Sequence, residues 1–117
     1  MTNPDVALTD SAILARLKAL PGWTHSDDAI RREYPTDGWR GSLLVANAIG
    51  FICEAADHHA DLLVTFPKVS VALSTHSAGG ITAKDFEVAA LIERQVLWTP
   101  GGDSELTGPK KPFVRGE

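Results

Sequence analysis

The sequence predicts an α+β fold with the element order α-β-β-α-β-β-α, in which a four-stranded antiparallel sheet carries helices packed on one face. Three segments repeat apolar residues at steps of three or four, which indicates helices, and the segments between them alternate apolar and polar residues, which indicates strands. The strands come in two pairs, each joined by a short polar turn. Pairs of strands that alternate with helices are typical of an antiparallel sheet covered on one side.

The predicted elements follow one another closely. In chain order they are a helix at Thr9–Leu20, a strand around Trp23, a strand at Ala29–Tyr34, a helix at Trp39–Asp57, strands at Asp61–Phe66 and Val69–His76, and a helix from Thr82 to Val96. Residues 1–98 are expected to form a single domain, and residues 99–117 an extended C-terminal tail.

The first helix has a good N-cap in Thr9 and several apolar residues at helical spacing, and Pro21 and Gly22 end it. The hairpin after it is inferred from the polar turn at Asp27 and Asp28, which separates two short strand-like segments.

The second helix is predicted by a stripe of apolar residues from Leu43 to Ala56. Beyond it, apolar and polar residues alternate from Val69 to His76, and Pro67 forms the turn between the two strands of this second pair.

Thr82 is the expected N-cap of the last helix, and Asp85, three residues later, completes a capping-box pattern. After Trp98 the chain contains several glycines and prolines and few large apolar residues, which indicates an extended tail.

Length and composition exclude several function classes. The chain has 117 residues and a formal net charge of −4, so it lacks the basic balance typical of proteins that bind nucleic acid. Its single cysteine, Cys53, can form neither an internal disulfide nor a cysteine-rich zinc site. No long apolar run predicts a membrane span, and the N-terminal segment has no cationic start, so we expect a cytoplasmic protein.

Three of the four histidines fall close together, and they carry the candidate chemistry. His58 and His59 lie at the end of the second predicted helix, and His76 lies at the end of a strand. Glu54 precedes His58 by four residues, so the two side chains are expected to share a helix face. Asp57 directly precedes His58.

These residues alone leave three interpretations open. The imidazoles could act as general acid and base, since histidine changes its charge near neutral pH. Alternatively, Glu54 and His76 together with His58 or His59 could bind a divalent metal ion. The imidazoles could also have only a structural role at the C-terminus of a helix, where a positive charge is favourable.

A longer residue pattern distinguishes between these interpretations. The run EAADHHA at residues 54–60, followed by Phe66, His76 and Asp85 at intervals of six, ten and nine residues, resembles the signature of the pterin-4a-carbinolamine dehydratases. The segments FPKV, VALSTH and AGGIT, at residues 66–69, 71–76 and 78–82, and the PGW at residues 21–23 are also similar to that family. The resemblance covers about residues 8–97. Where the family usually places proline after the two histidines, this chain has Ala60.

The resemblance implies the same α+β fold, assembled as a homodimer or homotetramer. It also implies a reaction, the elimination of water from 4a-hydroxytetrahydrobiopterin to give quinonoid dihydropterin, which recycles the cofactor of aromatic amino-acid hydroxylases. The reaction needs a base and an acid and no metal, nucleotide or other cofactor.

The resemblance also implies roles for individual residues. His58 and His59 match the catalytic pair, His76 is the third active-site histidine, and Glu54 and Asp85 are the supporting carboxylates. The residues expected to contact the pterin are Trp23, as an aromatic wall, together with Asp57, Ser74 and Thr75. Two other functions stay open: a non-catalytic relative that acts as a binding or assembly protein, and a metal-binding module.

Overall fold

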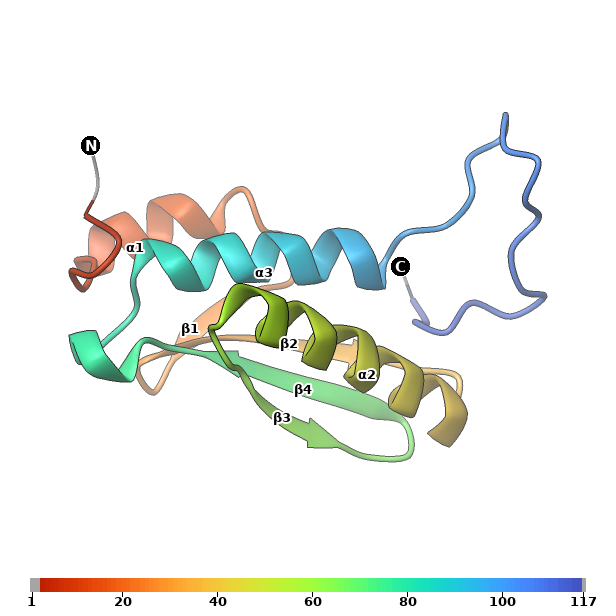
Figure 1. Ribbon diagram of the computed structural model, residues 1–117, viewed down its shortest axis with the longest axis horizontal. Helices are drawn as coiled ribbons and strands as arrows, with labels where there is room; N and C mark the ends of the chain where they lie inside the picture. Colours follow the sequence, from red (N-terminus) through yellow and green to blue (C-terminus); the bar gives the residue numbers. More distant parts are fainter. Residues whose placement is uncertain (1–2, 117) are drawn as a thin grey trace.

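The computed structural model describes residues 3–116, and its elements stand in the predicted order (Figure 1). The helices are α1 (Asp10–Leu17), α2 (Trp39–Ala56) and α3 (Ala83–Val96), and the strands are β1 (Thr24–Ser26), β2 (Ala29–Pro35), β3 (Asp61–Val64) and β4 (Lys68–Leu73). The strands form one antiparallel sheet in the order β1-β2-β4-β3, and the helices pack on one face of it. The predicted α+β fold is therefore confirmed.

The core lies between the sheet and the helices, and the period of two in the strands selects which side chains enter it. In β4, Val69, Val71 and Leu73 are buried, while the side chains between them are only partly covered. Ile30 and Tyr34 of β2 face the same side and are fully buried. The large apolar residues of α2 and α3 cover these side chains, so one core supports the whole sheet.

The first hairpin confirms the turn predicted at the two aspartates. Asp27 and Asp28 have φ angles of 51° and 60°, the left-handed pair that a tight two-residue turn between twisted strands requires. Helix α1 begins after Thr9, whose hydroxyl accepts a hydrogen bond from the Ala12 amide at 3.2 Å. It ends at Leu17, three residues before the predicted end.

Both strands of the second pair are shorter than predicted. Strand β3 ends at Val64, because the Thr65 amide donates to the Lys68 carbonyl at 2.9 Å and closes the turn. Strand β4 ends at Leu73, because Thr75 pairs with Gly80 across a tight loop. His76 therefore begins a short 3₁₀ turn, His76–Ala78, and is not the end of a strand.

The C-terminal residues leave α3, pass away from the domain and return to it (Figure 1). Val114 forms an isolated β-bridge with Thr36 and is buried against the core. On either side of it, the Asp37 amide donates to Phe113 and the Arg115 amide donates to the Pro35 carbonyl at 2.7 Å. The tail is thus tied to the end of β2.

Among the described residues, no helix has both the length and the apolar character needed to cross a membrane.

Candidate active site

The candidate site forms where α2 ends and α3 begins. The chain leaves α2 at Asp57, which adopts the left-handed conformation with a φ of 52° and acts as the C-cap. The next residue, His58, turns its ring toward the first turn of α3, where its Nε2 lies 2.6 Å from the Oδ1 of Asp85. Two elements far apart in sequence are thus joined by one imidazole–carboxylate contact.

Asp85 is held on both of its oxygens. The side chain is fully buried, and its Oδ2 accepts hydrogen bonds from the Thr75 hydroxyl at 2.8 Å and from the Thr82 amide at 2.9 Å. The second of these bonds completes the capping box expected for α3, which is confirmed. Because the carboxylate is fixed on one side, its other oxygen is presented to His58 in a defined direction.

The expectation that Glu54 and His58 share a helix face is wrong. An i, i+4 contact requires both residues to lie on the helix, and the left-handed Asp57 ends α2 one residue before His58. His59 contacts Glu54 instead, with 2.8 Å between the imidazole Nε2 and the carboxylate Oε1. Their side chains are 59% and 83% exposed, whereas the His58 side chain is only 13% exposed.

The two neighbouring histidines therefore have different environments. His58 contacts a buried carboxylate, and His59 contacts a carboxylate in water. Water screens the exposed pair more strongly than the partly buried one. The two neighbouring histidines are therefore not equivalent in this structure.

Some of the other predicted site residues lie close to the contact between His58 and Asp85. Thr75 touches Asp85 directly, and His76 follows Thr75 as an exposed residue at the start of the 3₁₀ turn. Ser74 is half-buried before them, and Asp57 is exposed at the C-cap. Within residues 3–116, no three histidine, cysteine, aspartate or glutamate side chains are grouped in a way that could hold a metal ion.

Trp23 is not brought to the histidines. Its side chain is buried, and its indole Nε1 donates to the Glu93 carboxylate at 3.0 Å. Glu93 lies eight residues after Asp85 on α3, which is about 12 Å along the helix. The expected role of Trp23 as a wall of the pterin site is therefore corrected: within this chain it packs in the core at the other end of α3.

The partners of Trp23 form a polar cluster that sequence reasoning missed. Glu93 also accepts hydrogen bonds from the Arg32 guanidinium at 3.2 Å and from the Tyr34 hydroxyl, and the guanidinium lies over the Tyr34 ring at 4.3 Å. The signal was the position of Arg32 between Ile30 and Tyr34, on the period that faces the core. An arginine on a core-facing position needs an acidic partner, and the partly buried Glu93 is that partner.

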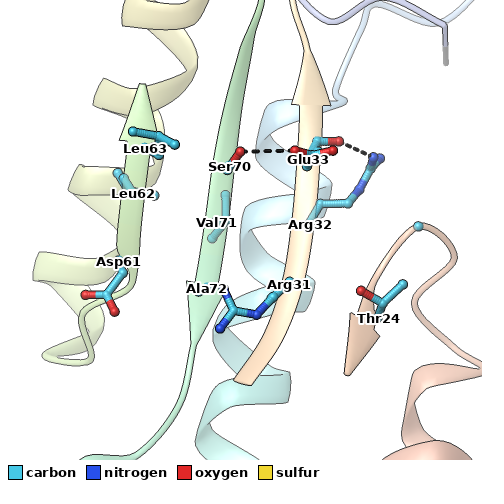
Figure 2. A pocket seen from close by; sticks show the side chains of 11 residues that line it. Thr24, Arg31, Arg32, Glu33, Asp61, Leu62, Leu63, Ser70, Val71 and Ala72 are labelled. Carbon is cyan, nitrogen blue, oxygen red and sulfur yellow. Dashed lines mark hydrogen bonds between the residues drawn. The ribbon is translucent and has the colours of Figure 1, made fainter. Parts of the chain in front are cut away.

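The outer face of the sheet carries a hollow of about 600 Å³ (Figure 2). The strand register sets Arg31, Ala72 and Asp61 in one row across it and Glu33, Ser70 and Leu63 in the next. The small side chains of β4 thus lie between charged or larger groups from β2 and β3. This hollow contains no histidine and lies on the side of the sheet away from the helices.

Comparison with known proteins shows the family to which this chain belongs. A family model described as pterin 4 alpha carbinolamine dehydratase matches residues 6–95. A relative from Aquifex aeolicus, provisionally named a pterin-4-alpha-carbinolamine dehydratase, is 42% identical over 89 residues, which cover 76% of this chain and 90% of the relative. One from Mycobacteroides abscessus with the same provisional name is 40% identical over 89 residues, covering 76% of this chain and 95% of the relative.

A solved structure extends the likeness to three dimensions. The crystal structure of a transcriptional coactivator/pterin dehydratase from Brucella melitensis matches with a TM-score of 0.70 and 29% sequence identity, covering 74% of this chain and 95% of that one. The segment that the family model matches includes His58, His59 and the Asp85 carboxylate that contacts His58. This chain belongs to the pterin 4 alpha carbinolamine dehydratase family.

Proposed function

We propose that this chain eliminates water from 4a-hydroxytetrahydrobiopterin and releases quinonoid dihydropterin, as a step in tetrahydrobiopterin recycling. The observation that carries the proposal is the contact of 2.6 Å between the mostly buried His58 and the fully buried Asp85. His59 follows His58 in the chain. Membership of a family named for a pterin carbinolamine supports the substrate class.

The elimination needs two proton transfers. A base removes a proton from a ring nitrogen of the pterin, the bond between C4a and its hydroxyl oxygen breaks, and an acid protonates the departing oxygen so that it leaves as water. No electron is gained or lost overall, since the new double bond takes up the electron pair that the nitrogen releases. The protein must supply a base and an acid that act together.

We assign the base to His58. Its partner Asp85 is buried and accepts two further hydrogen bonds, so it stays in place while the imidazole becomes charged. A fixed carboxylate stabilises the imidazolium that forms when His58 takes the proton, in the way that an acidic partner assists a histidine base in other enzymes.

The acid is assigned to His59. Its Nε2 lies 2.8 Å from the Glu54 Oε1, and its exposure allows water to return the proton after each turnover. His76, exposed and next to Thr75 in the chain, is the third histidine and a second candidate for orienting the hydroxyl group.

The decisive experiment measures the decay of synthetic 4a-hydroxytetrahydrobiopterin with the wild-type chain and with His58→Ala. The wild type is expected to accelerate the decay, and His58→Ala to lose at least about 100-fold of that acceleration. His25→Ala is the matched control, because His25 lies in β1 within the first hairpin. If the wild type does not accelerate the decay, or if His58→Ala equals it, the proposal is wrong.

The second candidate function is protein binding, and one surface favours it. The outward side of α2 exposes Leu43, Leu44 and Phe51, and the helix carries only one basic and one acidic residue, Arg40 and Glu54. A helix at the surface of a protein normally exposes polar side chains. We propose that a second copy of this chain covers α2, in a homodimer or homotetramer. Other protein partners are the alternative, because the similar Brucella melitensis protein is described as a transcriptional coactivator as well as a pterin dehydratase.

A further inference from the structure

Behind His58 lies a row of hydrogen-bonded side chains that the proposed proton transfers do not use directly. Thr82, Thr75 and Asp85 are all buried. The hydroxyl oxygens of the two threonines lie 2.8 Å apart, and the Thr75 hydroxyl lies 2.8 Å from the Asp85 Oδ2. The row continues through Asp85 Oδ1 to the Nε2 of His58 at 2.6 Å.

The number of hydrogens fixes the direction of every bond in this row. A threonine hydroxyl has one hydrogen, and that of Thr75 points to Asp85, which as a carboxylate can only accept. Thr82 must therefore donate its own hydrogen to Thr75, while its oxygen accepts from the Lys84 amide at 3.2 Å. All the bonds then point toward Asp85, from the threonine side and from the Thr82 amide.

These donors surround Asp85 as they would a carboxylate. Its Oδ2 accepts two hydrogen bonds, and the residue lies in the first turn of α3. An ionised Asp85 accepts at Oδ1 as well, so the hydrogen of the neutral His58 ring must be on Nε2. The ring nitrogen left without a hydrogen is Nδ1.

We propose that Thr75 and Thr82 are positioning residues: through Asp85 they fix the Nε2–H tautomer of His58 and leave Nδ1 as the atom that takes a proton. The tautomer is a property of the resting protein. Only the statement that Nδ1 exchanges a proton with the pterin rests on the proposed function. The expected substrate contact of Thr75 is a backbone hydrogen bond, whereas its hydroxyl is turned inward and is occupied by Asp85 and Thr82.

Other charged groups near this row are accounted for. Asp57 lies next to His58 at the C-cap of α2, and His59 is engaged with Glu54. The Lys84 amino group, adjacent in sequence to Asp85, pairs with Asp5 at 2.7 Å. Each of these groups is exposed, so water screens its effect on the buried row.

The test is ¹⁵N NMR of the histidine rings in the full chain, on the high-pH side of the titration of His58, with its signals identified by their absence in His58→Gln. The wild type is expected to show a hydrogen on Nε2 only. In Thr75→Val, which keeps the shape and removes the hydroxyl, the two tautomers are expected to mix. Thr75→Ser restores the hydroxyl and is expected to restore the single tautomer.

Thr36→Val is the matched control. Thr36 is also a buried threonine whose hydroxyl contacts a second hydroxyl, that of Ser42 at 2.7 Å, but it lies at the opposite end of β2 from the first hairpin. Its replacement should leave the His58 signals unchanged. A wild-type spectrum with the hydrogen on Nδ1, or with mixed tautomers, overturns the proposal without any variant, and so does an unchanged His58 in Thr75→Val.

Kinetics give a separate readout. In Thr75→Val we expect kcat for the dehydration to fall by roughly 10- to 100-fold, the range for a lost partner of a functional side chain, with KM changed little. If the tautomer behaves as expected but the wild type has no dehydratase activity, the proposed reaction fails and the positioning role stands. If the wild type is active and Thr75→Val keeps both its tautomer and its kcat, the positioning role fails and the reaction stands.

Discussion

At the scale of single residues, Glu93 shows how one carboxylate can fix several side chains. It accepts hydrogen bonds from Trp23, Arg32 and Tyr34, which come from the start of the first hairpin and from β2. Burial alone would raise the pKa of Glu93, but the hydrogen bonds from Tyr34, Arg32 and Trp23 outweigh it and hold the pKa below its ordinary value of 4.5. Burial and the same carboxylate raise the pKa of Tyr34, so the phenol stays neutral.

Glu93→Gln is expected to lower the free energy of unfolding by about 2 kcal/mol, because a neutral amide replaces the carboxylate that accepts hydrogen bonds from Trp23, Arg32 and Tyr34. Urea unfolding at pH 7 measures this loss. Glu87→Gln is the control, because it is the same substitution at an exposed position of the same helix. Equal stabilities of the two variants would contradict the expected role of Glu93.

The pH dependence of stability has a definite sign at this residue. Because the folded-state pKa of Glu93 is lowered, its contribution is fully present above 4.5, the ordinary value, and is lost as the pH falls through the folded-state pKa. The wild type should therefore lose stability in acid more steeply than Glu93→Gln, and the two unfolding free energies should converge below pH 4.5. A constant difference between them from pH 7 to pH 3 would contradict this.

Asp85 has a structural role in the capping box of α3 and, in the proposed reaction, a chemical role as the partner of His58. Asp85→Asn is expected to reduce the dehydratase rate by about 100-fold or more, since an amide cannot stabilise the imidazolium of His58 as a carboxylate does. It should also lower the free energy of unfolding by about 1 kcal/mol through the weakened capping box. Initial rates and urea unfolding measure the two effects. Asp10→Asn, at an exposed position in the first turn of α1, serves as the control.

At the scale of elements, the turn of the first hairpin holds two non-glycine residues in an unfavourable backbone conformation. Asp27 and Asp28 both have positive φ angles, a conformation that glycine adopts freely and other residues adopt at a cost. Asp28→Gly is therefore expected to raise the free energy of unfolding by about 0.5–1 kcal/mol, and Asp28→Val to lower it by about 1 kcal/mol. Urea unfolding of both variants checks the prediction, which would be wrong if the valine variant were the more stable one.

The elements themselves were predictable because each carries its signal locally. Thr9 and Thr82 mark helix starts, two aspartates mark a hairpin turn, and the alternation in β4 shows which face is buried. The orientation of His58 was not predictable from helix spacing. It depends on the left-handed Asp57, and aspartate adopts that conformation only where the surrounding fold requires it.

The contacts within the candidate site were not predictable from the sequence. The family resemblance proposes His58, His59, Glu54 and Asp85 as site residues, yet which carboxylate contacts which histidine follows from the chain path between α2 and β3. The position of Trp23 could not be predicted from the neighbouring sequence either. Its partner Glu93 lies 70 residues away in the sequence, and only packing of α3 on β2 brings them together.

At the scale of the whole molecule, the outward face of α2 predicts the state of assembly. Phe51 is 76% exposed in the single chain. If the proposed oligomer forms through α2, Phe51→Asp is expected to give a monomer, because burial of a charge in an apolar interface is strongly unfavourable. Light scattering after size-exclusion chromatography measures the mass. Leu106→Asp, at an exposed apolar position in the tail, should leave it unchanged. A wild-type chain that is monomeric at all accessible concentrations would contradict the proposed assembly.

The capping box of α3 has a consequence for inactivation. Asp85 closes the first turn of that helix and holds His58, so fraying of this turn and loss of the aligned imidazole are one event. Such local openings need far less free energy than global unfolding. Heating or mild denaturant should therefore abolish the proposed activity reversibly while the sheet remains intact. Deuterium uptake at the first amides of α3 would report the fraction of molecules in which this turn is closed.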